Sequence, residues 1–250
     1  MRMETKLTPA HAAKQICQAL KAEGKPARAA QSRKFFKDDE DVQFYGLSVP
    51  EARQVEREFF AAVKPYWTVA EAFVLCDLLI RDSHLEAKQI GIEVLARFKR
   101  KFSPALFDTS KEWLTKNYCG NWATTDAFCS LVLGPLVQMY PALLVDLHHW
   151  TQDRNLWVRR AAAVSLVSAA RRGLYLEDAY QVAVALRDYP EDLIHKAVGW
   201  LLREAGRTDA ARLESFLLAQ GARLPRTALR YAIEKFPPEK RKWLLEQTKP

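Results

Sequence analysis

Residues 155–187 read NLWVRRAAAVSLVSAARRGLYLEDAYQVAVALR, and this stretch decides the fold class. It holds two helical patterns, 155–172 and 175–187, and no strand-like alternation bounded by hairpin turns. Gly173 lies between the two patterns, where we expect it to cap the end of the first helix. The stretch therefore predicts two helices joined by a short turn.

The same helical pair recurs along the chain. Helices of a first series begin near residues 49, 84, 122, 155, 191 and 225, and those of a second series begin near 69, 104, 141, 175, 208 and 238. Such a pair cannot bury its apolar face alone, so successive pairs stack. We therefore predict an all-α fold, a right-handed α-α superhelix, as a single solenoid domain over residues 1–250. The predicted helices span 8–23, 26–36, 49–63, 69–82, 84–99, 104–118, 122–138, 141–150, 155–172, 175–187, 191–205, 208–220, 225–236 and 238–247.

Helix start signals support this division of the chain. Ser48 and Glu51, Thr68 and Glu71, and Ser83 and Glu86 each stand three residues apart before an apolar run. In a capping box of this kind, each side chain accepts a hydrogen bond from a backbone N–H near the other residue. The sequence therefore predicts three capped helix starts.

Composition narrows the class of partner. The chain has 38 Lys and Arg against 30 Asp and Glu, a formal net charge of +8, which favours a polyanionic partner. The four cysteines form no CxxC pair and no set with histidine at finger spacing, so we expect buried thiols and no metal. The sequence shows no signal peptide and no apolar run long enough to cross a membrane. We therefore expect a soluble, cytoplasmic protein that does not bind a membrane.

The helices of the first series carry most of the residues of the types that bind nucleic acid. If these residues line one face, the cations neutralise phosphates and the aromatic rings pack on sugars or bases. Taken singly, each tryptophan is more often a core residue, and each arginine more often faces water. Together they predict a basic concave groove, formed by Arg159, Arg160, Lys196, Arg203, Arg226 and Arg230 with Trp122, Trp157 and Trp200 between them.

Asp126 is the unusual member of this set. It lies one helical turn after Trp122, so the two side chains share a face. An acid in a groove suited to DNA repels phosphate, so it needs either an arginine partner or a chemical task. Arg160 is the natural partner, and a structural salt bridge is the alternative to catalysis.

Three segments together resemble the signature segments of the AlkD DNA glycosylases, whose fold is a solenoid of HEAT-like repeats. They are Asn121-Trp-Ala-Thr-Thr-Asp126, Asn155-Leu-Trp-Val-Arg-Arg160 and His195-Lys-Ala-Val-Gly-Trp-Leu-Leu-Arg203. The resemblance implies that Asp126 is the catalytic carboxylate and that Trp122 and Trp200 contact the deoxyribose of the damaged nucleotide. It also implies that Arg160 anchors the DNA backbone and Arg203 holds a phosphate. We expect Arg159 and Lys196, which lie within these segments, to contact DNA as well.

The N-terminal part matches this family less closely. Phe35 or Phe36 stands where the family has a tyrosine, and Ser48 stands where glutamine is usual. The chain also has extra residues around 37–41. We include Phe35 and Ser48 among the candidate DNA contacts.

The resemblance implies a DNA glycosylase for base excision repair of alkylation damage. Its substrates would be positively charged N3- or N7-alkylated purines, such as 3-methyladenine and 7-methylguanine, in double-stranded DNA. The base would leave without flipping, from a monomeric hydrolase that needs no cofactor. Two alternatives stay open: a non-enzymatic HEAT-like protein that binds branched or damaged DNA, and a protein–protein scaffold.

Overall fold

The computed structural model describes residues 6–37 and 42–249, and every regular element among them is helical. This confirms the all-α prediction. The extra residues suspected at 37–41 lie, apart from Lys37, outside the described part. The chain divides into two compact units, residues 1–132 and 133–250. The single-domain interpretation stays a prediction.

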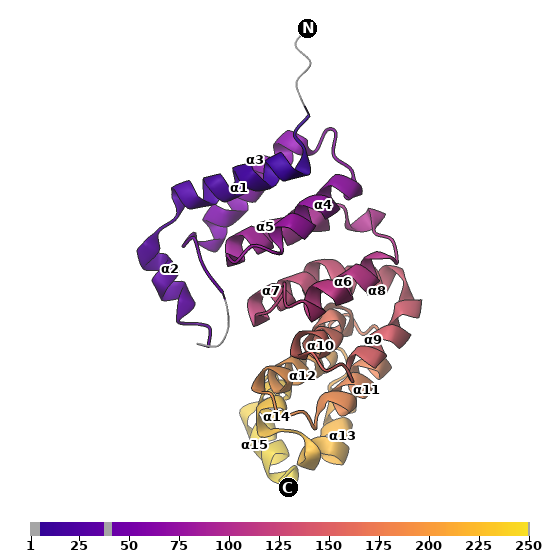
Figure 1. The fold of residues 1–250 in the computed structure, drawn as a ribbon. Helices are drawn as coiled ribbons and strands as arrows, with labels where there is room; N and C mark the ends of the chain where they lie inside the picture. The colour runs from indigo at the N-terminus through magenta and orange to yellow at the C-terminus, as the bar shows by residue number, and fades with distance from the viewer. Residues whose placement is uncertain (1–5, 38–41, 250) are drawn as a thin grey trace. The chain divides into compact units, whose positions relative to one another are not determined.

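In the first unit, helices of the first series form one layer. α3 contacts α5, and α5 contacts α7. Helix α4 packs on α5, and α1 packs on α3 and α4, as Figure 1 shows. The helices are α1 (Pro9–Glu23), α2 (Pro26–Arg33), α3 (Val49–Val63), α4 (Val69–Leu79), α5 (Leu85–Ala96), α6 (Leu106–Thr115) and α7 (Trp122–Phe128), with a short 3-10 turn η1 (Lys99–Lys101) after α5.

The second unit repeats this layering. α10 contacts α12, and α12 contacts α14, whereas α11 and α13 pack on them from the second layer. Its elements are α8 (Gly134–Met139), η3 (Pro141–Leu143), α9 (Leu144–Trp150), α10 (Leu156–Ala170), α11 (Leu176–Leu186), α12 (Asp192–Ala205), α13 (Ala210–Gln220), η4 (Gly221–Arg223), α14 (Arg226–Ala232) and α15 (Pro238–Gln247). The two predicted helix series are therefore two structural layers within each unit.

The predicted helix 122–138 departs most from expectation. Its middle, Cys129–Leu133, is a π-helical turn that joins α7 to α8. Pro135 explains this, because it has no N–H to donate and its ring crowds the carbonyl of Leu131 four residues earlier. The local widening of the helix accommodates that clash.

Two of the three predicted capping boxes form. Ser48 with Glu51 starts α3, and Thr68 with Glu71 starts α4. The third prediction is wrong, since α5 begins after His84 without a side-chain cap. Glu86 instead accepts hydrogen bonds from a backbone segment about forty residues earlier in the chain.

No single helix of the described part is long and apolar enough to cross a membrane. Only two segments bent sharply against each other, Trp122–Met139 and Pro141–Trp150, meet that criterion together, by length and composition alone.

Candidate nucleic-acid interface

The start of α7 presents Trp122 and Asp126 on one face. Asn121 caps the helix, and its side-chain oxygen accepts a hydrogen bond from the N–H of Thr124 at 2.8 Å. Thr125 is buried and donates from its hydroxyl to the carbonyl of Cys119 at 2.7 Å, which fixes the turn. Trp122 is 36% exposed and Asp126 is half-buried. An aromatic ring and a carboxylate thus lie one helical turn apart on a rigid helix start.

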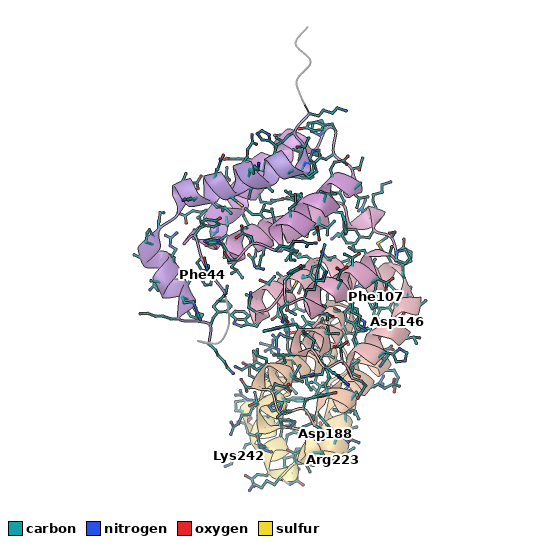
Figure 2. All side chains as sticks on the ribbon, viewed as in Figure 1. Phe44, Phe107, Asp146, Asp188, Arg223 and Lys242 are labelled. Atoms are coloured by element: carbon teal, nitrogen blue, oxygen red, sulfur yellow. The ribbon has the colours of Figure 1, made fainter. Side chains whose placement is uncertain are left out.

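Phe36 covers part of Trp122. The two rings stack with centroids 5.2 Å apart and planes 16° apart, and Phe36 in turn contacts Phe44 at 5.4 Å. Figure 2 labels Phe44 near α2. Phe35, the predicted DNA contact, is 75% exposed and belongs to no ring pair among the described residues. Of the two candidate phenylalanines, Phe36 is therefore the one that joins the aromatic cluster.

A buried carboxylate holds the segment that carries Phe44. Glu86, 6% exposed, accepts hydrogen bonds from the backbone N–H groups of Tyr45, Gly46 and Leu47 at 3.1, 2.8 and 3.2 Å. Gly46 has φ = 90°, and a Cβ there would lie 2.2 Å from the carbonyl oxygen of Lys25. Sequence reasoning missed this role, because the spacing of Glu86 from Ser83 suggested a capping box.

The aromatic rings of this segment reach the start of α5. The Tyr45 ring stacks on His84 with centroids 3.9 Å apart. The His84 ring nitrogen Nδ1 lies 2.9 Å from Asp82 Oδ1. Burial, followed by the charge of Asp82, raises the pKa of Tyr45, so its hydroxyl stays neutral. Ser48, a predicted DNA contact, uses its side chain to cap α3. Its contact with DNA stays a prediction.

In the second unit, one face of α12 combines cations with a tryptophan. Lys196, Trp200 and Arg203 follow one another at intervals of four and three residues, so they share a face. All three are at least partly exposed. Lys196 forms an ion pair with Asp192 at 2.8 Å, which raises the pKa of the lysine and keeps it charged. Arg203 forms an ion pair with Glu234.

Gly199 explains how this face is supported. A Cβ at this position would lie 2.5 Å from Tyr231 Cβ and 2.6 Å from the carbonyl oxygen of Ala228. α12 and α14 therefore approach each other more closely than any side chain would allow. Gly199 places the neighbouring Trp200 and Lys196 on a helix that is tightly fixed.

Two predicted contacts on α10 are buried. Arg159 is 5% exposed, and its guanidinium donates hydrogen bonds to the carbonyls of Asp153 and Arg154 at 2.8 and 2.9 Å. The guanidinium also forms an ion pair with Glu191 and lies over the Tyr189 ring. These partners favour a structural role, and the predicted contact of Arg159 with DNA stays a prediction.

Arg160 is also 5% exposed and donates to the carbonyl of Leu193 at the start of α12. It therefore links α10 to α12, and its predicted contact with DNA stays a prediction. Trp157 is 8% exposed and belongs to the core, as the alternative interpretation of each tryptophan allowed.

Comparison with known proteins decides the family. The family described as DNA alkylation repair enzyme matches residues 16–236, which cover most of the chain and parts of both compact units. The chain belongs to the DNA alkylation repair enzyme family. The matched range includes all the candidate residues named above.

One solved structure has a fold similar to that of this chain. It is described as a predicted DNA alkylation repair enzyme from Enterococcus faecalis, and it matches with a TM-score of 0.74 and 18% sequence identity. The match covers 86% of this chain and 97% of that one. At that identity the likeness shows a shared fold alone. No curated protein matches the chain.

Proposed function

We propose that this protein is a DNA N-glycosylase that releases positively charged N3- or N7-alkylated purines from double-stranded DNA by hydrolysing the glycosidic bond. Family membership supports action in the repair of alkylated DNA. The observation that carries the finer proposal is the half-buried carboxylate of Asp126 on the same helix face as the exposed ring of Trp122.

The chemistry of the substrate explains why one carboxylate is sufficient. An N3- or N7-alkylated purine carries a formal positive charge, so it leaves without being protonated by a general acid. What remains is to stabilise the positive charge that develops at C1′ of the sugar and to orient a water molecule. Asp126 performs both tasks in this proposal, since a fixed carboxylate is most effective where water is partly excluded.

The proposed reaction needs no general acid, and the surroundings of His195 agree with this. Its ring nitrogen Nε2 lies 2.7 Å from the carbonyl oxygen of Tyr189, which fixes the imidazole of this α12 residue against the loop before the helix. His195 therefore supports the start of α12 and has no part in the proposed reaction.

Aromatic rings hold the sugar in this proposal. Trp122 packs on the deoxyribose, and its face attracts the developing positive charge. The contact of Trp200, in the second unit, with the deoxyribose stays a prediction. Phe36 backs Trp122 by stacking on it. Contact with the sugar of a stacked lesion removes the cost of flipping the base out of the helix, which amounts to a few kcal/mol.

Cations of α12 bind the DNA backbone. Lys196 and Arg203 are the strongest candidates because they are charged, partly exposed and on the same face as Trp200. Arg160 contributes by joining α10 to α12, and Arg159 has no contact with DNA in the proposal. The protein acts as a monomer, without a metal or a small-molecule cofactor.

The test measures free base released from duplex DNA that contains 7-methylguanine or 3-methyladenine. We expect Asp126→Asn to lower the rate roughly 100- to 1000-fold with DNA affinity retained, as when one charge-stabilising group is removed. Asp146→Asn, at an exposed aspartate of α9, serves as the matched control. Unchanged release by Asp126→Asn overturns the catalytic role. Tight binding to branched DNA with no base release by the wild-type protein supports the non-enzymatic alternative instead.

A further inference from the structure

The turn that follows α5 carries a run of cations that the proposed reaction does not use. Lys99, Arg100 and Lys101 form the 3-10 turn η1, and all three are exposed. Their side chains contact no acidic group among the described residues. The sequence contains no Asp or Glu between Glu93 and Asp108. Positive charge is therefore concentrated here without local neutralisation.

Some cations at the ends of other helices are paired. Arg97 at the end of α5 binds Glu56 through two hydrogen bonds of 2.9 and 2.7 Å. In the second unit the same holds at the ends of α10 and α12, where Arg171 pairs with Glu204 at 2.7 Å and Arg203 with Glu234. The three cations of η1 differ from these in having no acidic partner among the described residues.

Aromatic residues on either side of the turn fix it. Phe102 is 3% exposed, and the ring of Phe98 packs edge-on against Phe60 of α3 at 5.8 Å. The backbone N–H of Lys101 donates to the carbonyl of Phe98 at 2.7 Å. The three cations therefore extend from a rigid support, and less side-chain and backbone entropy is lost when a ligand binds.

The turn follows the end of α5 that is opposite to the segment leading to Trp122. Contacts from Trp122 through Phe36 and Phe44 lead to the segment whose Tyr45 stacks on His84, at the start of α5. The turn η1 follows the other end of α5, whose twelve residues span about 18 Å. The two surfaces therefore lie at opposite ends of α5.

We propose that Lys99, Arg100 and Lys101 form a second phosphate-binding surface, which holds a stretch of duplex DNA other than the one at Trp122. Duplex DNA carries about one negative charge per 1.7 Å of its axis, counted over both strands, so it attracts a fixed group of unpaired cations. The inference rests on the proposed action on DNA. A protein that holds two segments can pass from one to another while it searches for damage.

The experiment measures bridging of two undamaged duplexes. One short biotinylated duplex is immobilised and saturated with protein at low salt, and capture of a second, fluorescent duplex is then quantified. We expect the triple variant K99A/R100A/K101A to capture at least about tenfold less of the second duplex than the wild type, since binding falls steeply with each lost phosphate contact. Its thermal unfolding midpoint should be unchanged.

The matched control is K14A/K21A/K64A, which removes the same charge from other exposed lysines that form no ion pair among the described residues. It should bridge as the wild type does. Bridging by K99A/R100A/K101A at the wild-type level, or an equal loss in the control, overturns the proposal. So does binding of this turn to an acidic peptide or to anionic vesicles in place of the duplex.

Base release from a single short duplex separates this inference from the proposed function. K99A/R100A/K101A should release 3-methyladenine at the wild-type rate. If the wild-type protein bridges duplexes and releases no base, the second surface stands and the glycosylase proposal fails.

Discussion

Phe36 stacks on Trp122 with ring centroids 5.2 Å apart and ring planes 16° apart. This contact joins the segment after α2 to the start of α7 within the first unit. It gives the exposed tryptophan one covered and one accessible side. Any ligand that packs on Trp122 therefore meets a ring whose position depends on Phe36.

We predict that Phe36→Ala lowers kcat/KM for base release roughly 2- to 10-fold. An aromatic pair contributes about 0.5–1.5 kcal/mol beyond its buried area, and here that energy holds Trp122 in place. Phe35→Ala is the control, since Phe35 is exposed and has no ring partner among the described residues. Equal losses in the two variants would contradict a specific role for Phe36.

The cations of α12 should differ from those of α10 in the salt dependence of DNA binding. Lys196→Ala and Arg203→Ala should each reduce the slope of log K against log salt concentration by about 0.9, because each removes one phosphate contact. The slope is measured by titrating labelled duplex at several salt concentrations.

Arg159→Ala should leave that slope unchanged and lower the free energy of unfolding instead. It removes charged hydrogen bonds to Glu191 and to the backbone carbonyls of Asp153 and Arg154, a loss of about 1.5–3 kcal/mol. Urea unfolding at fixed pH measures this effect. A reduced salt slope with normal stability would show that Arg159 reaches phosphate after all.

Gly199→Ala should destabilise the second unit, although alanine favours a helix over glycine by up to about 1 kcal/mol. The new Cβ would lie 2.5 Å from Tyr231 Cβ and 2.6 Å from the carbonyl oxygen of Ala228, so α12 and α14 must separate. Overpacking of this kind costs about 1–3 kcal/mol. Higher stability in the variant, measured by urea unfolding, would show that the helices have room to move.

Glu51 should make stability depend on pH below about 4.5. Hydrogen bonds from Lys25, Ser48 and Arg28 hold its pKa well below the ordinary value of 4.5. A carboxylate with a lowered pKa stabilises the folded state above its unfolded pKa, and this stabilisation is lost as the pH falls toward the folded value.

Wild-type protein should therefore unfold at higher urea concentration than Glu51→Gln at pH 7. The difference should shrink as the pH is lowered from 4.5. A difference that stays constant down to pH 3 would show that the charge of Glu51 is not responsible.

The sequence predicted the helical layers well and the candidate contacts unevenly. Helix starts such as Ser48 and Thr68 were found because a capping box depends on residues only three positions apart. Glu86 was misassigned because its actual partners, the N–H groups of Tyr45, Gly46 and Leu47, lie about forty residues earlier. Local spacing carries no information on such partners.

The burial of Arg159 could not be predicted either. The position of a residue in an amphipathic helix determines which side of the helix it faces. It does not determine whether an acidic residue of the next repeat covers it. Glu191 and Tyr189, about thirty residues later, enclose the Arg159 guanidinium. Lys196 has only Asp192 on its own helix as an ion-pair partner among the described residues, and it remains accessible.

The sequence by itself determined the helical pairs and their period, and it placed Asp126 one turn after Trp122. These features depend on contacts between residues close in the chain, which capping, helical spacing and apolar periodicity fix. Only the tertiary structure decided that Phe36 rather than Phe35 meets Trp122, that Glu86 anchors a distant segment, and that Arg159 is enclosed. Each of these depends on packing between elements far apart in sequence, where burial and long-range hydrogen bonds outweigh local preference.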